Sequence, residues 1–143
     1  MTAKLTVVIP TYRREEVLLD TIGGLLKLQS PPAEILVVDQ TPVHEQSTDR
    51  PLSTLENQRR IRLIRLTEPS VTHAMNIGLR LASSDVVLFV DDDIVPGPRL
   101  VDAHARAQTK HNIVAGQVLQ PGELPSNEST SEREFRFSSS RGG

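Results

Sequence analysis

Residues 86–98 read VVLFVDDDIVPGP, and this stretch decides how the rest of the chain is interpreted. Five apolar residues run directly into three aspartates, and the Pro-Gly-Pro sequence after them predicts a turn. A wholly apolar strand is typical of the middle of a sheet that is covered on both faces. We therefore expect Val86–Val90 to be a central strand whose carboxyl end carries Asp91, Asp92 and Asp93.

The rest of the first 120 residues alternates short apolar runs with segments of helical period. Further strands are expected at Leu5–Pro10, Ile35–Val38, Ile61–Leu66 (near a sheet edge, because apolar and basic residues alternate) and Ile113–Ala115. Helices are expected at about Arg13–Gln29, Leu52–Gln58, Val71–Ala82 (capped by Ser70) and Arg99–Lys110. This alternation predicts an α/β fold, in which helices cover both faces of a mainly parallel sheet.

Composition limits the classes of protein to consider. The chain has 143 residues, which suits one domain, and 16 Lys and Arg against 18 Asp and Glu give a net charge of −2. No basic face is indicated, so we expect no nucleic-acid partner. There is no cysteine, no apolar run near the roughly 18 residues of a membrane span, and no apolar stretch near residue 1 of the kind that a signal peptide has. We therefore expect no membrane segment in this chain and a cytoplasmic location.

The polar residues that follow the expected strands are the candidates for a binding site. In open α/β sheets, ligands bind beyond the carboxyl ends of the strands, where the strand order reverses. If the strand at 86–90 returns beside the first strand, Thr11 and the three aspartates flank that point. The residues that follow the first two strands are Thr11, Tyr12 and Arg13, and then Asp39.

The three consecutive aspartates predict a cation. Adjacent carboxylates raise one another's pKa unless a cation neutralises them. Asp91 and Asp93 share a direction in extended backbone, whereas Asp92 points elsewhere. Carboxylate oxygens suit Mg²⁺ or Mn²⁺, although a solvated turn would also carry such a run.

Other polar residues have two interpretations each. Asp39 accepts hydrogen bonds from a ribose or base, or is an ordinary turn residue. Asn76 is a poor helix former that needs a polar partner, and Gly78 lets backbone or ligand come close. Arg13 and Arg14 face phosphate or solvent. The histidines, which lack metal-ligand spacing, are expected to be ordinary polar residues: His44, His73, His104 and His111.

Five segments together resemble the donor-binding half of family 2 glycosyltransferases, which have the GT-A fold. These segments are TVVIPTYRR at 6–14, ILVVDQT at 35–41, EPSVTHAMNIGL at 68–79, VVLFVDDDIVPGPRLV at 86–101 and AGQV at 115–118. The resemblance implies a nucleotide-sugar-binding domain over residues 1–118, followed by a polar loop or tail over 119–143. It implies an inverting enzyme that binds a UDP- or dTDP-sugar with Mn²⁺ or Mg²⁺ and transfers the sugar to an acceptor that the sequence does not identify.

The resemblance also assigns site residues. By this resemblance, Asp91 and Asp93 of the family's DxD motif bind the metal. The residues that the resemblance implies for binding the nucleotide sugar are Pro10, Thr11, Tyr12, Arg13, Asp39, Asn76, Gly78, Asp91 and Asp92. Asn76 and Gly78 match a motif usually written ARNxG, in which Met75 here replaces the arginine.

Family members continue beyond this point with more strands, an acceptor region and a catalytic base. We therefore expect a truncated chain whose base lies beyond residue 143, which is inactive in transfer alone and which self-associates through an unpaired sheet edge near Ile113–Ala115. Three other interpretations remain. One is a non-catalytic fragment that binds nucleotide or a partner. The second is a haloacid-dehalogenase-type phosphatase with Asp91 as nucleophile and Asp93 as acid and base, but no later acidic pair follows. A nucleotidyltransferase would carry a glycine-rich loop after its first strand, which TYRRE lacks.

Overall fold

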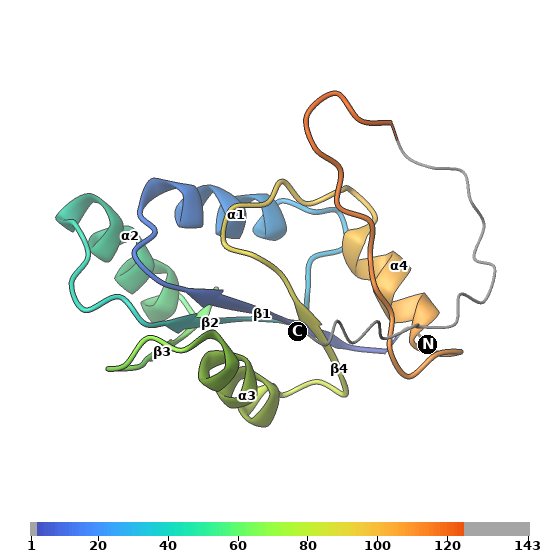
Figure 1. Cartoon of the computed structure of the whole chain (residues 1–143), viewed down its shortest axis with the longest axis horizontal. Coiled ribbons are helices and arrows are strands. Elements are labelled where there is room, and N and C mark those ends of the chain that lie inside the picture. Colours follow the sequence, from blue (N-terminus) through green and yellow to red (C-terminus); the bar gives the residue numbers. More distant parts are fainter. Residues whose placement is uncertain (1–2, 125–143) are drawn as a thin grey trace, which may run out of the picture.

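The computed structural model describes residues 3–124, which form four strands and four helices in strict alternation (Figure 1). In chain order these are β1 (Leu5–Thr11), α1 (Glu16–Leu26), β2 (Glu34–Asp39), α2 (Gln46–Asn57), β3 (Arg62–Arg65), α3 (Val71–Leu81), β4 (Val86–Phe89) and α4 (Leu100–Ala107). Most of the predicted polar tail, residues 125–143, lies outside the described residues. Within residues 3–124, no helix is both long and apolar enough to cross a membrane.

The strands form one parallel sheet in the order β3-β2-β1-β4. The chain winds outward from β1 to β3 and then returns to place β4 on the other side of β1. The strand order therefore reverses between β1 and β4, an arrangement that the sequence permitted but did not determine. In β1 and β2 the last paired residues are Thr11 and Asp39, so both strands end at the same rim.

Helices cover both faces of the sheet, as predicted. Alternate residues of β1 serve the two faces because successive side chains of a strand point in opposite directions. Val7 and Ile9 pack with α1, α2 and α4, whereas Val8 packs with α3. Figure 1 shows α1 and α2 on one side of the sheet and α3 on the other. The fold is thus an α/β sandwich, in which helices cover both faces of a parallel sheet and β1 is an interior strand.

The prediction that Val86–Val90 is a central strand is wrong for the described part of the chain. There β4 pairs with β1 alone and forms an edge of the sheet. Its apolar sequence has another cause: Leu88 packs into the core under α1 and α4, and Phe89 packs against the α3 side. An apolar run reports that both faces are covered, and it does not report how many strands lie beside it.

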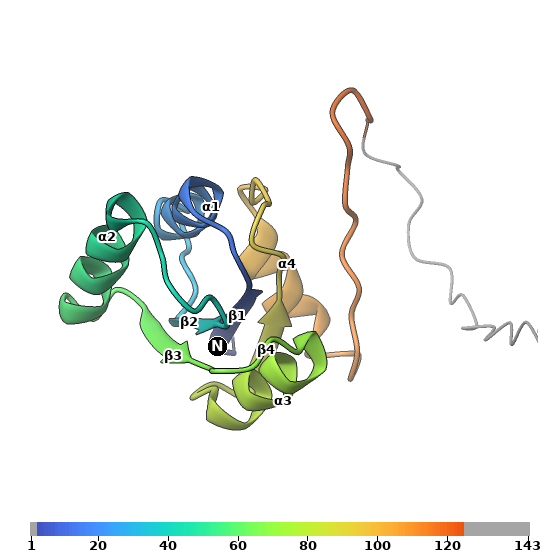
Figure 2. The same cartoon turned by 60° about the vertical axis from the view of Figure 1, so that its left-hand side comes forward.

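The predicted strand at Ile113–Ala115 is also absent. Residues 113–120 form no strand, and Ile113 is 85% exposed. Figure 2 shows the segment after α4 running as an extended trace beside the body of the domain. A short apolar run becomes a strand only when a neighbouring strand takes up its backbone hydrogen bonds, and none of the described residues does so. Within residues 3–124, the sheet ends at β3 on one side and at β4 on the other.

The helices differ from the predictions mainly at their ends. The first helix begins at Glu16 because Arg13 has a left-handed backbone (φ 52°) that a helix cannot contain. The second begins at Gln46, earlier than the predicted Leu52, and contains Pro51. The predicted cap of α3 is confirmed, since the Ser70 hydroxyl accepts a hydrogen bond from the His73 N–H at 3.3 Å.

Candidate functional site

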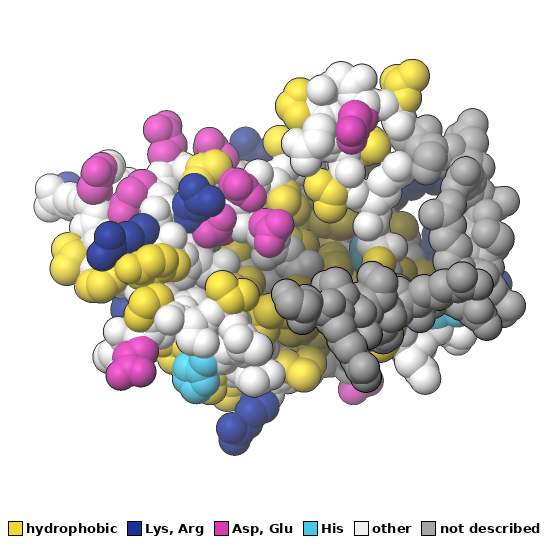
Figure 3. Space-filling model, viewed as in Figure 1, with side chains coloured by type: hydrophobic (Ala, Val, Ile, Leu, Met, Phe, Trp, Pro, Cys, Tyr) yellow, Lys and Arg dark blue, Asp and Glu magenta, His cyan; other side chains and the backbone are white. Residues whose placement is uncertain are grey.

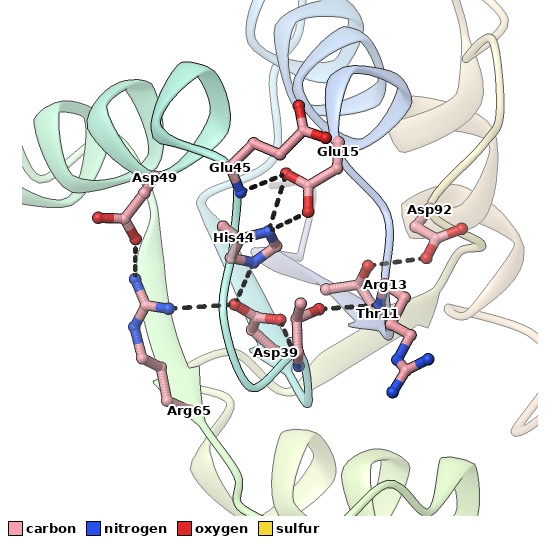
Figure 4. A network of polar contacts seen from close by, with 10 residues as sticks. Thr11, Arg13, Glu15, Asp39, His44, Glu45, Asp49, Arg65 and Asp92 are labelled. Atoms are coloured by element: carbon pink, nitrogen blue, oxygen red, sulfur yellow. Dashed lines mark hydrogen bonds and ion pairs between the residues drawn. The ribbon is translucent and has the colours of Figure 1, made fainter.

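The carboxyl ends of β1 and β2 and the loop after β4 meet at one rim of the sheet. Thr11, the last residue of β1, is paired in register with Asp39 of β2. Its hydroxyl donates a hydrogen bond of 2.8 Å to Asp92 Oδ2 (Figure 4). Thr11 therefore joins the two acidic segments, and the prediction that Asp39 and the three aspartates lie together at one rim is confirmed.

Asp92 is the anchored member of the three aspartates. Its second oxygen, Oδ1, lies 3.3 Å from Nε of Arg14, and its side chain is only 12% exposed. Its backbone carbonyl accepts a 2.9 Å hydrogen bond from the hydroxyl of Thr21. Asp91 and Asp93 are exposed on either side. The acidic loop thus turns its middle carboxylate inward and presents the outer two to solvent.

Helix α1 supports the acidic loop through one face. The Thr21 hydroxyl also contacts the Ile94 carbonyl oxygen, at 3.2 Å. One turn later, a Cβ atom added to Gly24 would lie 2.9 Å from Pro96 Cδ, so only glycine lets the loop approach this closely. From the sequence alone, a glycine inside an expected helix is only a weak helix former. The structure shows that Gly24 allows α1 to pack closely against a segment that is distant in sequence.

Asp39 is fully buried, and both of its oxygens have partners within the chain. Oδ1 accepts a 2.9 Å hydrogen bond from the Thr41 N–H. Oδ2 lies 2.7 Å from His44 Nε2 and 3.4 Å from Arg65 Nη1. The Asp39 side chain therefore holds the end of β2 in place. Only its longest contact, with the half-exposed Arg65, lies at the surface.

His44 contradicts the expectation that the histidines are ordinary polar residues. Its buried ring joins Asp39 to Glu15, whose Oε1 lies 3.1 Å from His44 Nδ1 (Figure 4). Burial alone would raise the pKa of Glu15, but hydrogen bonds from Thr48 and His44 and the electrostatic attraction of His44 lower that pKa below its usual value. The ring thereby ties the loop after β2 to the start of α1. Sequence reasoning missed this residue because no spacing pattern marks a histidine that joins two separate loops.

Tyr12 and Arg13 form the exposed lip of the rim. The Tyr12 side chain is 40% exposed, and the Arg13 guanidinium carbon lies 5.1 Å from the centre of its ring. The left-handed backbone of Arg13 is held by a 2.9 Å hydrogen bond from its N–H to the Thr41 hydroxyl. Such a conformation costs about 1–2 kcal/mol and is typical of functional loops. Pro10 lies just inside this lip and is partly buried.

Asn76 and Gly78 lie on opposite sides of α3. Asn76 is exposed, and its side chain makes no hydrogen bond within residues 3–124, so the polar partner that we expected is not found there. Gly78 is buried, and a Cβ atom at this position would lie 2.3 Å from Val8 Cγ1. Gly78 therefore serves the close approach of α3 to β1. At the start of α3, the Ser70 N–H donates to Gln40 Oε1, which fixes this helix to the rim.

The side chains present suit a divalent cation only in part. Across the described residues, no group of three or more His, Asp or Glu side chains is arranged to hold a metal ion. The acidic loop offers the exposed carboxylates of Asp91 and Asp93 to solvent. Mg²⁺ and Mn²⁺ commonly bind one or two carboxylates and complete their shell with phosphate oxygens and water. The site fits a cation that arrives with a phosphorylated ligand.

The surface around the rim is acidic. Figure 3 shows acidic side chains gathered over the start of α1 and the loop after β4, with a few Lys and Arg side chains among them. A groove of about 470 Å³ lies elsewhere, between α1 and α2, and is lined mainly by apolar residues such as Leu19, Leu26 and Leu55. It contains none of the candidate site residues. The candidate site is accordingly the open rim and not this groove.

Comparisons with known proteins agree with this geometry. The family model described as glycosyl transferase family 2 matches residues 6–141. Validoxylamine A glucosyltransferase of Streptomyces hygroscopicus subsp. limoneus is 32% identical over 69% of this chain and 22% of its own length. TarS, a poly(ribitol-phosphate) beta-N-acetylglucosaminyltransferase of Staphylococcus aureus strain Mu50, is 30% identical over 78% of this chain and 20% of its own length. The chain thus spans about a fifth of the length of these relatives.

Solved structures share the fold. Residues 1–349 of S. aureus TarS, in complex with UDP-GlcNAc, superimpose with a TM-score of 0.64 over 86% of this chain and 37% of that chain, at 22% identity. The mannosyltransferase PcManGT of Pyrobaculum calidifontis, in complex with GDP-Man and Mn²⁺, gives a TM-score of 0.58 over 69% of this chain and 30% of that chain, at 23% identity. At these identities the likeness establishes the architecture of the sheet and its helices.

Proposed function

Because this chain belongs to the family 2 glycosyltransferases, we propose that it is the donor-binding part of such an enzyme. In this proposal a nucleoside diphosphate sugar lies across the rim of β2, β1 and β4, and a divalent cation joins its diphosphate to the loop after β4. The observation that carries the proposal is the position of Thr11, which joins Asp39 to Asp92 at a point where the strand order reverses. Ligands of open α/β sheets bind at such points.

The nucleoside end of the donor would lie at the carboxyl ends of β1 and β2. Pro10 and Thr11 line the base of this region, and the exposed ring of Tyr12, with Arg13 beside it, offers a flat surface to a base. A ribose or base that reaches Asp39 would compete with Arg65, because that contact is the longest one that Asp39 makes and Arg65 is half-exposed. The contacts of Asp39 with Thr41 and His44 would stay in place.

The diphosphate end of the donor would lie at the acidic loop. Asp91 and Asp93 would hold Mn²⁺ or Mg²⁺, which supplies positive charge against the departing diphosphate. Asp92 would keep the loop in position through Thr11, and it lies close enough to the rim to face the donor's ribose or diphosphate. On α3, the exposed amide of Asn76 is the group available for a direct contact, while Gly78 sets the distance between α3 and β1.

The relatives support this class of donor and leave its details open. TarS was solved with UDP-GlcNAc, and PcManGT was solved with GDP-Man and Mn²⁺. We propose a UDP- or dTDP-sugar for this chain, with a divalent cation and an acceptor yet to be identified. None of the described residues matches an acceptor region or a catalytic base, so we propose that the chain alone binds the donor without transferring the sugar. The open edge of β4 would pair with further strands or with a second chain.

Isothermal titration of the 143-residue chain tests this function. We expect UDP or dTDP to bind with Mn²⁺ present and to bind much more weakly with a chelator. The substitution Asp93→Ala should abolish the metal-dependent part and leave the fold intact, because Asp93 is exposed. The matched control is Asp85→Ala, at the opposite end of β4. Equal binding by the parent and by Asp93→Ala would exclude Asp93 as a ligand of the metal.

A further inference from the structure

Arg14 lies between two carboxylates of the acidic loop. Its Nε is 3.3 Å from Asp92 Oδ1, and its Nη2 is 3.9 Å from Asp93 Oδ2. Within residues 3–124, no other Lys or Arg side chain comes within 4.0 Å of a carboxylate of this loop. The guanidinium is therefore the positive charge that offsets the repulsion among three neighbouring aspartates in the protein without metal.

The two contacts of Arg14 differ in strength. Asp92 is largely buried, and its second oxygen is held by Thr11, so the Nε contact lies in a fixed and partly water-excluded place. The contact with Asp93 is longer, and both side chains in it are about half-exposed (49% and 51%). Exposed ion pairs contribute little to stability. The end of the guanidinium can thus leave Asp93 at small cost while Nε keeps its hold on Asp92.

We propose that Arg14 is a counter-ion that the acidic loop exchanges for the divalent cation, and that its released N–H groups then bind the diphosphate of the donor. This inference rests on the proposed function. A cation bound at Asp93 repels the guanidinium, which stays at the rim because Asp92 holds its Nε. Guanidinium groups present paired N–H donors that match phosphate oxygens. Arg14 is then within reach of the phosphate that the cation brings.

This role gives Arg14 two effects of opposite sign. Arg14 competes with the cation for Asp93, so it weakens the binding of metal alone. It also adds charge-assisted hydrogen bonds to the phosphate, so it strengthens the binding of nucleoside diphosphate when the metal is present. A residue that merely held the loop in shape would strengthen both binding steps.

The test measures both steps on the full chain by isothermal titration: MnCl₂ alone, and then UDP at saturating Mn²⁺. The variants are Arg14→Gln, which removes the charge, and Arg14→Lys, which keeps the charge but lacks the paired N–H groups. The matched control is Arg80→Gln, an exposed arginine in the last turn of α3. Circular dichroism and the thermal midpoint check that each variant folds.

For Arg14→Gln we expect Mn²⁺ to bind about two- to fivefold more tightly, the size of an exposed ion pair. We expect UDP to bind about tenfold more weakly, the size of a charge-assisted hydrogen bond. Arg14→Lys keeps the charge, so it should bind Mn²⁺ as weakly as the parent does, and it should restore only part of the parent's affinity for UDP. Arg80→Gln should match the parent in both steps.

Two results would overturn this role for Arg14 while leaving the proposed function in place. In the first, the parent binds Mn²⁺ and UDP, and the Arg14→Gln variant binds both with the same affinities as the parent. The other is a variant that weakens both steps together, which would make Arg14 a support of the loop. A folded parent that binds neither Mn²⁺ nor UDP would instead overturn the proposed function, and the role of Arg14 with it.

Discussion

Replacing Thr21 with valine tests whether α1 holds the acidic loop. Valine has nearly the shape of threonine but no hydroxyl, so the change removes the hydrogen bonds to the Asp92 and Ile94 carbonyl oxygens at 2.9 and 3.2 Å. The Thr21 side chain is buried, so water cannot easily take its place. Both carbonyls belong to the loop that carries Asp91 and Asp93.

The expected size follows from those two contacts. Removing the donor from partly buried acceptors costs about 1–3 kcal/mol of unfolding free energy. At about 4 °C per kcal/mol for a domain of this size, the thermal midpoint should fall by about 4–12 °C. Groups that orient metal ligands typically contribute about 10- to 100-fold in metal affinity. Because Thr21 acts on the loop's backbone, we expect the lower end, about a tenfold loss of Mn²⁺-dependent UDP binding.

Denaturant unfolding and isothermal titration measure the two effects. Thr21→Ser keeps the hydroxyl and should retain most of the UDP affinity. Thr54→Val is the matched control, since the Thr54 hydroxyl also donates to a carbonyl, that of Arg50, but at an exposed position on α2. That change should stay within about 0.5 kcal/mol. If Thr21→Val and Thr54→Val lose the same small amount of stability and keep the parent's UDP affinity, α1 does not position the loop.

Four further substitutions probe close packing, a buried hydrogen bond and the pH dependence of stability. Gly78→Ala should lower the unfolding free energy by about 1–3 kcal/mol, because the added Cβ would lie 2.3 Å from Val8 Cγ1. Gly23→Ala, whose Cβ would have nothing within 4 Å, should raise the unfolding free energy by up to about 1 kcal/mol. Equal effects of the two changes in denaturant titrations would refute the close packing of Gly78 as the cause. His44→Leu leaves the buried Asp39 carboxylate without its closest partner and should cost about 3 kcal/mol by the same measurement, and a loss below about 1 kcal/mol would show that the ring is dispensable. Burial lowers the pKa of His104 below its ordinary 6.5, so the unfolded chain binds more protons as the pH falls below 6.5, and stability falls with it. His104→Leu should flatten that pH dependence of the unfolding free energy, and an unchanged slope would assign it to other groups.

The sequence predicted that the strand ends meet at one rim, but it did not predict the contacts that hold the acidic loop and Asp39 in place. Apolar runs ending in Thr11, Asp39 and the aspartates were enough to predict one shared rim, because the carboxyl ends of parallel strands meet at one edge of a sheet. The edge position of β4 was not predictable, since an apolar run reports covered faces and not neighbouring strands.

The supports of the site depend on contacts that only the fold creates. Thr21 meets the carbonyl of a residue 71 positions later, and His44 meets a glutamate 29 positions earlier. No local pattern marks either pair. Gly24 carried a signal, an unfavourable residue in a helix, but only the structure shows that Pro96 is the neighbour it admits.

Paramagnetic relaxation by Mn²⁺ locates the bound cation on the chain, and a chain of 15.8 kDa suits the measurement by NMR. Mn²⁺ is added in small steps to the ¹⁵N-labelled chain with UDP present, and the loss of each amide signal is recorded. We expect the amides of Asp91–Asp93 and Thr11 to broaden first, and we expect diamagnetic Mg²⁺ with UDP to shift the signals of Tyr12 and Thr41. Broadening centred away from the loop after β4, or UDP-induced shifts confined to the groove between α1 and α2, would contradict this expectation.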